Sequence, residues 1–330
     1  MTGYIIRRLL LNLVVIWLVA SFVFIAVRVL PGDFAAQQVT NQFFSGGAGT
    51  TKEDKDAALK AVRERLGTDA PVLEQYVRYF GNLLQGDFGK SFQTGKPAWD
   101  VMADALPYSV QLGLMSLFIA LAVALPVGIL SAIRQDSWMD GVFRSVAILG
   151  LAAPSFWTAS LLTGVVLRND LWDLKVVNPP GIWNDPLASL QLFIIPAIAG
   201  GIASGAVLMR ILRSQLLDVL RQDYVRTAWA KGLRERSIVT GHVLRNGLIP
   251  VVTVIGFLMG GLVGGSIILE QMFNIPGMGQ KLLGAILVRD VPVVQLQALV
   301  ISIGLVSINL LVDLSYFWID PRITVRGQGA

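Results

Sequence analysis

Six long apolar segments constrain the fold of this 330-residue chain more than any other feature. A helix needs about 20 mostly apolar residues to cross the hydrocarbon core of a bilayer. Segments of that kind run over residues 9–29, 106–133, 142–167, 189–211, 248–269 and 295–318. They are too apolar for amphipathic surface helices, and they lack the alternation of barrel strands. The sequence therefore predicts an all-α polytopic membrane protein with six transmembrane helices.

Composition narrows the chemistry that the chain can perform. Hydrophobic residues make up 54% and charged residues 15% of the chain, whereas soluble domains carry about 25% charged residues. Cysteine is absent and His242 is the only histidine, which argues against disulfides, thiol catalysis and Cys- or His-based metal sites. The apolar segments contain no nucleophile–base pair. An intramembrane enzyme is therefore not expected, and the basic net charge is better explained by membrane topology than by nucleic-acid binding.

The distribution of Lys and Arg predicts the orientation. With the N-terminus in the cytoplasm, the inside segments hold Arg7, Arg8 and eight basic residues from Arg210 to Arg245. This bias is typical of cytoplasmic loops, so we expect both termini inside. The first apolar run is longer than a signal-peptide core, which favours an uncleaved first helix. Residues 1–29 then form the cytoplasmic N-terminus and first helix, 30–105 an external segment, 106–318 a five-helix core, and 319–330 a cytoplasmic tail.

The external segment 30–105 has helical patterns of its own. Residues 51–66 form a polar helical stretch, and residues 72–84 place Leu73, Val77, Phe80 and Leu84 at helical spacing. We expect this apolar stripe to pack on the outer face of the membrane part. The nearby GDFGKS (residues 86–91) is not a phosphate-binding loop, because Leu84 stands where that motif requires glycine.

Residues 212–247 form a long basic loop between the fourth and fifth apolar segments. The run YVRTAWAKG favours a helix that ends at Gly232, and a second helical stretch follows from Arg234 to about Leu244. By itself the pattern fits a headgroup-contacting loop, an interfacial amphipathic helix, or a docking element for a soluble partner.

A family resemblance favours the third interpretation. The loop reads DYVRTAWAKGLRERSIVTGHVLRNGLIPVVTVIG (residues 223–256) and resembles the signature loop of bacterial ATP-binding-cassette importer permeases of the dipeptide/oligopeptide (peptide/nickel) family. The glutamate of the general importer pattern is absent, whereas the peptide-subfamily pattern is matched throughout. Residues 66–92, 268–283, 289–295 and 309–323 also resemble segments of these permeases. The long external segment is similar to that of the first of two permeases usually encoded together.

The resemblance implies partners and roles. It implies a heterodimer with a second homologous permease, two cytoplasmic ATPase subunits beneath it, and an external substrate-binding protein, in the bacterial cytoplasmic (inner) membrane. ATP and Mg would bind the ATPases, and this chain would bind no cofactor and hydrolyse no ATP. Peptides are the expected substrates, with nickel chelates, haem or glutathione as alternatives. The residues that would form the ATPase-coupling loop are Tyr224, Arg226, Ala228, Ala230, Lys231, Gly232 and His242.

Ionisable residues near the spans are functional candidates by default. Glu270 is expected at the outer end of the fifth span, as a pathway or binding-protein contact, and Asp313 near the inner end of the sixth, as a partner of a cytoplasmic arginine. Gly260, Gly261, Gly264 and Gly265 give the fifth span a small-residue face for a helix contact or the pathway. The rival class is an ATP-independent secondary transporter. It predicts several buried carboxylates or an inverted repeat, and neither is evident.

Overall fold

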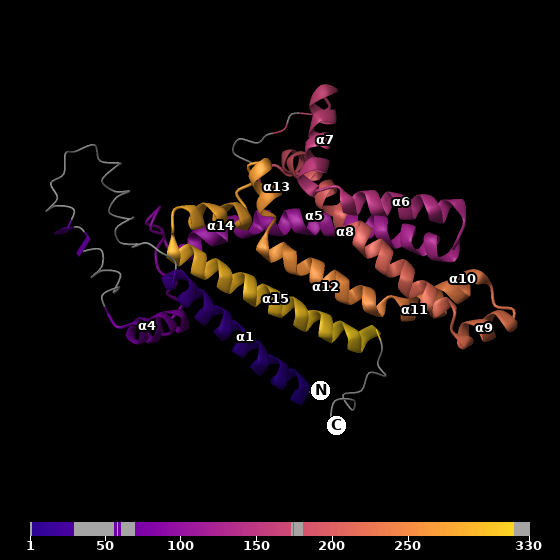
Figure 1. Cartoon of the computed structure of the whole chain (residues 1–330), viewed down its shortest axis with the longest axis horizontal. Coiled ribbons are helices and arrows are strands. Elements are labelled where there is room, and N and C mark those ends of the chain that lie inside the picture. Colours follow the sequence, from indigo (N-terminus) through magenta and orange to yellow (C-terminus); the bar gives the residue numbers. More distant parts are fainter. Residues whose placement is uncertain are drawn as a thin grey trace. The chain divides into compact units, whose positions relative to one another are not determined.

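A computed structural model describes residues 2–29, 56–57, 59–60, 70–172, 174 and 181–319. These residues contain helices and no named strand (Figure 1). The helices are α1 (Thr2–Val29), α4 (Val72–Leu84), α5 (Ala98–Ile133), α6 (Trp138–Ala152), α7 (Ser155–Arg168), α8 (Pro186–Leu220), α9 (Asp223–Ala230), α10 (Glu235–Ile238), a π-helical segment (Val239–Val243), α11 (Leu244–Gly247), α12 (Ile249–Gly264), α13 (Ile267–Met272), α14 (Met278–Leu287) and α15 (Val291–Ile319).

Four of the described helices, in α1, α5, α8 and α15, are long and apolar enough to cross a bilayer. Two bent pairs, α6 with α7 and α10–α11 with α12, raise that number to six if each pair is one span. The chain is an all-α polytopic membrane protein, as its apolar segments predict.

Two expected spans differ from the helices observed. Residues 142–167 are not one straight helix, because α6 and α7 meet at 102° around Ala153 and Pro154. Proline has no amide hydrogen to donate and forces the preceding residue into an extended conformation, which ends α6. Residues 248–269 are also divided. The helix α12 stops at Gly264, and Gly265 adopts a φ of +72° that breaks the helix before α13.

The chain forms two compact units. Unit 1 comprises Met1–Leu10, Ala105–Lys281 and Ile303–Ala330, and unit 2 comprises Leu11–Asp104 and Leu282–Ser302.

Small residues set the close contact between α8 and α5 in unit 1. A Cβ added to Gly201 would lie 2.8 Å from Ile119 Cγ2 and 2.9 Å from the carbonyl oxygen of Ser116. One turn further along α8, a Cβ on Gly205 would meet the backbone of Ala120 at 3.3 Å. Glycines four positions apart let two membrane helices approach closely, because no side chain separates their backbones at these positions. The sequence GIASG thus fixes how α8 lies against α5.

In unit 2, aromatic residues join α4 to α1. The rings of Tyr76 and Tyr79 each lie 5.3 Å from that of Phe24, and the Tyr76 hydroxyl lies 2.8 Å from Ser21 Oγ. The predicted apolar stripe contributes little to the contact between α4 and α1, because Leu73, Val77 and Leu84 are 74%, 64% and 89% exposed. Phe80, the aromatic member of the stripe, packs against Tyr76 and Tyr79, so the contact with α1 is made by an aromatic cluster. Most of the stretch 51–66 lies outside the described residues.

The GDFGKS segment belongs to a turn that Asp290 holds in unit 2. The Asp290 carboxylate accepts hydrogen bonds from Ser91 Oγ (2.5 Å) and from the backbone N–H groups of Phe92 (2.9 Å) and Gln93 (3.4 Å). Within GDFGKS, the Ser91 hydroxyl is therefore bound to a carboxylate of the chain itself. Asp290 has a structural role here.

Candidate functional site

The predicted coupling loop is a helical arm at one end of unit 1. The helix α9 begins shortly after α8 ends, and α10, the π-helical segment and α11 return the chain to α12 (Figure 1). Gly232 ends the α9 turn with a φ of +73°, a conformation that only glycine adopts without strain. The expected end of the first helix at this glycine is confirmed.

One face of the arm is packed against α8. Val225 and Ala228 are buried, at 0% and 7% exposure, in a cluster that includes Leu212 and Leu216 of α8. The return path is equally close, because a Cβ on Gly247 would lie 2.6 Å from Leu216 Cδ2. Because Val225 and Ala228 are three positions apart, they form one apolar face of α9, and that face packs against the C-terminal half of α8. Both parts of the arm, α9 and the return segment at Gly247, therefore pack against α8.

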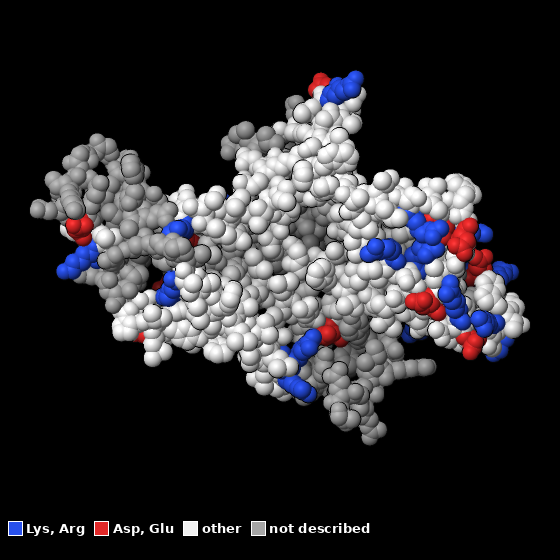
Figure 2. Space-filling model, in the orientation of Figure 1, with Lys and Arg blue, Asp and Glu red and all other residues white. Residues whose placement is uncertain are grey.

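The opposite face of the arm is exposed. Tyr224, Trp229 and Leu233 are 44%, 47% and 41% exposed, and the Tyr224 hydroxyl accepts a hydrogen bond of 3.0 Å from Asn246 Nδ2. Figure 2 shows basic and acidic side chains gathered where α9, α10 and the adjoining α5–α6 turn lie in Figure 1. Six of the seven predicted coupling residues are exposed: Tyr224, Arg226, Ala230, Lys231, Gly232 and His242.

Ala228 is the exception among the predicted coupling residues. Its side chain points into the cluster with Leu212 and Leu216, so it contacts the chain itself. The small size that suggested a docking contact instead lets α9 approach α8. The role of the other six residues in ATPase binding stays a prediction.

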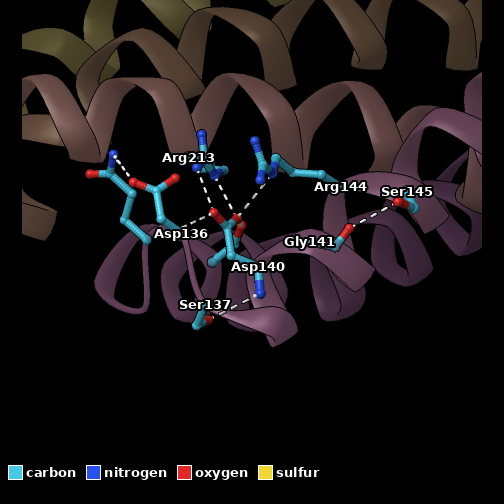
Figure 3. A network of polar contacts seen from close by, with 9 residues as sticks. Asp136, Ser137, Asp140, Gly141, Arg144, Ser145 and Arg213 are labelled. Atoms are coloured by element: carbon cyan, nitrogen blue, oxygen red, sulfur yellow. Dashed lines mark hydrogen bonds and ion pairs between the residues drawn. The ribbon is translucent and has the colours of Figure 1, made fainter.

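A buried ion pair joins α6 to α8 close to the arm (Figure 3). The Asp140 carboxylate is fully buried and accepts two hydrogen bonds from Arg213, at 2.9 Å from Nε and 2.8 Å from an Nη nitrogen. Ser131 Oγ donates at 2.5 Å and the Asp136 backbone N–H at 3.0 Å. The two-point geometry of the guanidinium fixes both distance and orientation.

The local sequence explains why Asp140 lies there. Ser137 caps α6 by accepting the Asp140 backbone N–H at 3.3 Å, which places the aspartate in the first helical turn. Sequence reasoning misses this residue because the predicted apolar segment begins only at residue 142. The signal that could have found it is a carboxylate two residues before a membrane span, a position that needs a partner when buried. In the sequence, Arg213 is only one of several basic residues of the loop.

Glu270 lies in a niche built by backbone groups. Its Oε1 accepts from Ser109 Oγ (2.7 Å) and the Ser266 backbone N–H (3.2 Å), and its Oε2 accepts from the Gln280 backbone N–H (2.9 Å). The Gln280 donor belongs to the first turn of α14, where helix N–H groups are free to bind an anion. Glu270 therefore joins α13 to α5 and α14.

Glycines enclose the Glu270 carboxylate. A Cβ on Gly265, Gly277 or Gly279 would come within 2.5–2.9 Å of its atoms, so no larger residue fits. Burial raises the pKa of the carboxyl, and the surrounding hydrogen bonds offset part of that effect. The side chain is 0% exposed, which makes it a structural anchor in this conformation. Its predicted contact with a substrate or a binding protein stays a prediction.

A cavity of about 320 Å³ lies beside this niche within unit 1. It is lined by parts of α5, α7, α8, α12 and α13, with Ser109, Gly265 and Ser266 shared with the Glu270 niche. Its lining is small, apolar or hydroxylic and carries no charged side chain: Ser109, Leu112, Gly113, Ser116, Leu117, Ser155, Gly200, Ala203, Ser204, Leu258, Gly261, Gly265, Ser266 and Leu269. Such a wall can hydrogen-bond polar solutes without selecting a sign of charge.

The small-residue face of the fifth span divides between two contacts. Gly261 and Gly265 line the cavity, whereas a Cβ on Gly260 would lie 2.5 Å from Leu305 Cδ2 of α15. Asp313, near the C-terminal end of α15, forms an ion pair with Arg8 of α1. Arg8 lies near the start of α1, so the pair joins the N-terminal end of α1 to the C-terminal part of α15.

Comparisons with known proteins agree on one family. Residues 124–325 match the family model of the binding-protein-dependent transport system inner membrane component, and residues 1–113 match the model of its N-terminal part. A putative peptide transport system permease protein of Brucella abortus (strain 2308) is 36% identical over 323 residues, covering 98% of this chain and 99% of the relative. The glutathione transport system permease protein GsiC of Escherichia coli (strain K12) is 36% identical over 326 residues, covering 99% and 100%. The chain belongs to the family of binding-protein-dependent transport system inner membrane components.

Proposed function

We propose that this chain is one of two homologous permease subunits of an ATP-binding-cassette importer for peptides in the bacterial cytoplasmic membrane. Its termini and the α9–α11 arm lie in the cytoplasm, and the segment between α1 and α5 lies outside. The near full-length similarity to relatives named for peptide and glutathione transport supports this assignment. The chain supplies half of the translocation pathway, and an external substrate-binding protein delivers the solute.

One observation carries the coupling part of the proposal. The helix α8 holds the arm through Leu212 and Leu216, and the same helix lines the cavity through Gly200 and Ser204. A partner that pushes on the exposed face of α9 therefore acts on a helix that is also a cavity wall. Two cytoplasmic ATPase subunits, which bind ATP and Mg²⁺ themselves, are the partners that fit. Closure of the ATPase pair then displaces α8 and switches the access of the cavity between the two sides.

The cavity lining favours peptides as the substrate class. Peptides share polar backbone groups but differ in the charge of their side chains. The serine hydroxyls of the cavity wall can hydrogen-bond the shared backbone groups. A wall with charges of one sign would disfavour peptides whose side chains carry the same sign. Glutathione is the second candidate, because it is a peptide and because several full-length relatives are named for its transport.

Reconstitution tests this function directly. The chain, the second permease and the two ATPase subunits are placed in proteoliposomes with the binding protein, and uptake of labelled dialanine and labelled glutathione is measured. We expect uptake of at least one of them with ATP and none with ADP or with a hydrolysis-deficient ATPase. Uptake by the chain alone, driven by an ion gradient, would assign it to the secondary transporters and refute the proposal.

A further inference from the structure

The helix α8 carries two groups of contacts. Gly200, Ala203 and Ser204 line the cavity. Further along, Arg213 binds Asp140 and stands between Leu212 and Leu216, which pack against the arm. Ser204 and Arg213 are nine positions apart, which is about 14 Å at 1.5 Å per residue. A movement at the arm reaches the cavity wall along this distance if α8 turns as a rigid body about a fixed point.

The Asp140 carboxylate supplies such a fixed point. It is bound from both sides, by Arg213 of α8 and by Ser131 in the last turn of α5 and Asp136 in the α5–α6 turn. A buried ion pair contributes little net stability, because desolvation offsets the attraction. It does enforce one geometry, since a displaced partner leaves an unpaired buried charge. The network therefore resists sliding of α8 along α5 more than it stabilises the fold.

The packing around the pair agrees with a pivot. Next to Arg213, a Cβ on Gly128 of α5 would lie 2.9 Å from Leu212 Cδ2, so α5 and α8 are already in close contact there. Arg144, the other cation near Asp140, lies 3.6 Å away and is half exposed. Arg213 is therefore the partner that fixes α8, and Arg144 adds a weaker attraction within α6.

We propose that Asp140 and Arg213 are positioning residues for energy coupling, which hold the inner half of α8 on the α5–α6 turn so that displacement of the arm moves the cavity wall. This inference rests on the proposed function of the arm. Without the ion pair, the arm still binds the ATPase, but α8 slides against α5. The cavity wall then no longer moves when the arm is displaced. The defect is a loss of coupling, and ATPase binding is retained.

The coupling ratio separates this role from a merely structural one. In the reconstituted complex, ATP hydrolysed per molecule of labelled dialanine or glutathione imported is measured for Arg213→Gln, Arg213→Lys and Asp140→Asn. We expect Arg213→Gln and Asp140→Asn to raise this ratio about tenfold, the upper part of the range for residues that couple distant sites. Arg213→Lys keeps the charge but loses the two-point contact, so its ratio should be intermediate. Arg210→Gln, an exposed cation one turn away on α8, is the matched control and should leave the ratio unchanged.

A cysteine reporter tests the movement without reference to the substrate. The chain has no cysteine, so Ser204→Cys labels the cavity wall alone within this subunit. Its reaction rate with a water-soluble methanethiosulfonate reagent is measured in the assembled complex with ATP and without nucleotide. The rate should change on ATP binding in the parent reporter and in Arg210→Gln, and the change should be lost in Arg213→Gln.

Each outcome decides the inference. An unchanged coupling ratio and an intact ATP response in Arg213→Gln would overturn it. If Arg213→Gln and Asp140→Asn fail to assemble, Arg213→Lys decides, because a ratio equal to the parent's would overturn it as well. If the reaction rate of the parent Ser204→Cys reporter does not change on ATP binding, the proposed function of the arm is contradicted. This outcome differs from failure of the pivot, in which the parent reporter responds to ATP and Arg213→Gln responds equally.

Discussion

The close approach of α8 to α5 makes Gly201→Ala the most informative single substitution. The new Cβ would lie 2.8 and 2.9 Å from two carbon atoms of Ile119 and 2.9 Å from the Ser116 carbonyl oxygen. Rotation about χ1 can move Ile119 Cγ2, but Ile119 Cβ and the Ser116 carbonyl oxygen are fixed to the backbone of α5 and cannot move without shifting the helix. The substitution should therefore push α8 away from α5.

The magnitude follows from two opposing terms. Overpacking of this kind costs about 1–3 kcal/mol, and replacing a helical glycine by alanine returns about 1 kcal/mol. Gly164 of α7 is a matched control, because it is also within a helix and a Cβ added there would meet nothing within 4 Å. The helix term cancels between the two variants, so Gly201→Ala should be less stable than Gly164→Ala by about 1–3 kcal/mol.

Thermal unfolding of the purified permease assembly measures this difference. At about 2 °C per kcal/mol for a chain of this size, the two variants should differ in Tm by about 2–6 °C. Uptake should fall only in Gly201→Ala, because Gly200 and Ser204 beside it line the cavity. If Gly201→Ala were as stable as Gly164→Ala, the close contact between α8 and α5 would be wrong.

Three further predictions concern the arm and the two carboxylates. Gly232→Asp places a carboxylate on the exposed arm at a φ of +73°, so it should abolish uptake and ATPase stimulation and also cost about 1 kcal/mol of stability through backbone strain. Ala228→Glu buries a carboxylate beside Leu212 and should lower both Tm and uptake more strongly. Normal uptake in both variants would refute the coupling role. Because burial raises the pKa of Glu270, its contribution to stability is complete below pH 4.5, the ordinary value, and is lost as the pH rises through the raised pKa. The Tm of the parent relative to Glu270→Gln should thus fall as the pH rises from 4.5, and a constant difference would contradict this. Asp313→Asn removes the partly exposed pair with Arg8 and should cost less than about 1 kcal/mol without loss of uptake; a larger loss would give that pair a role beyond stability.

The sequence predicts the long helices well because lipid imposes a simple condition on them. A run of apolar residues long enough to cross the bilayer must satisfy its backbone internally, so α1, α5, α8 and α15 follow from composition alone. The break at Pro154 was not predicted, because proline alone does not decide it: Pro126 and Pro196 lie inside the continuous helices α5 and α8. The size of the 102° bend depends on how α6 and α7 pack against α8.

The site was less predictable because it depends on pairing between distant residues. Asp140 and Arg213 are 73 positions apart, and nothing in either local sequence names the other. Periodicity shows that Ala228 lies on a helix but not whether its face meets α8 or a partner. Glu270 stood out as a carboxylate near a span, yet the donors that enclose it come from α5 and from the start of α14. Tertiary structure decides such contacts.

Site-specific photo-cross-linking tests the central claim, that the exposed face of α9 binds an ATPase subunit. A benzoylphenylalanine is placed at Trp229 on that face, and in a second variant at Trp183 in the loop before α8, where the side chain is 92% exposed. In the assembled complex, we expect an adduct between this chain and the ATPase from position 229 and none from position 183. An ATPase adduct from position 183, or its absence from position 229 in a complex that transports, would contradict the account.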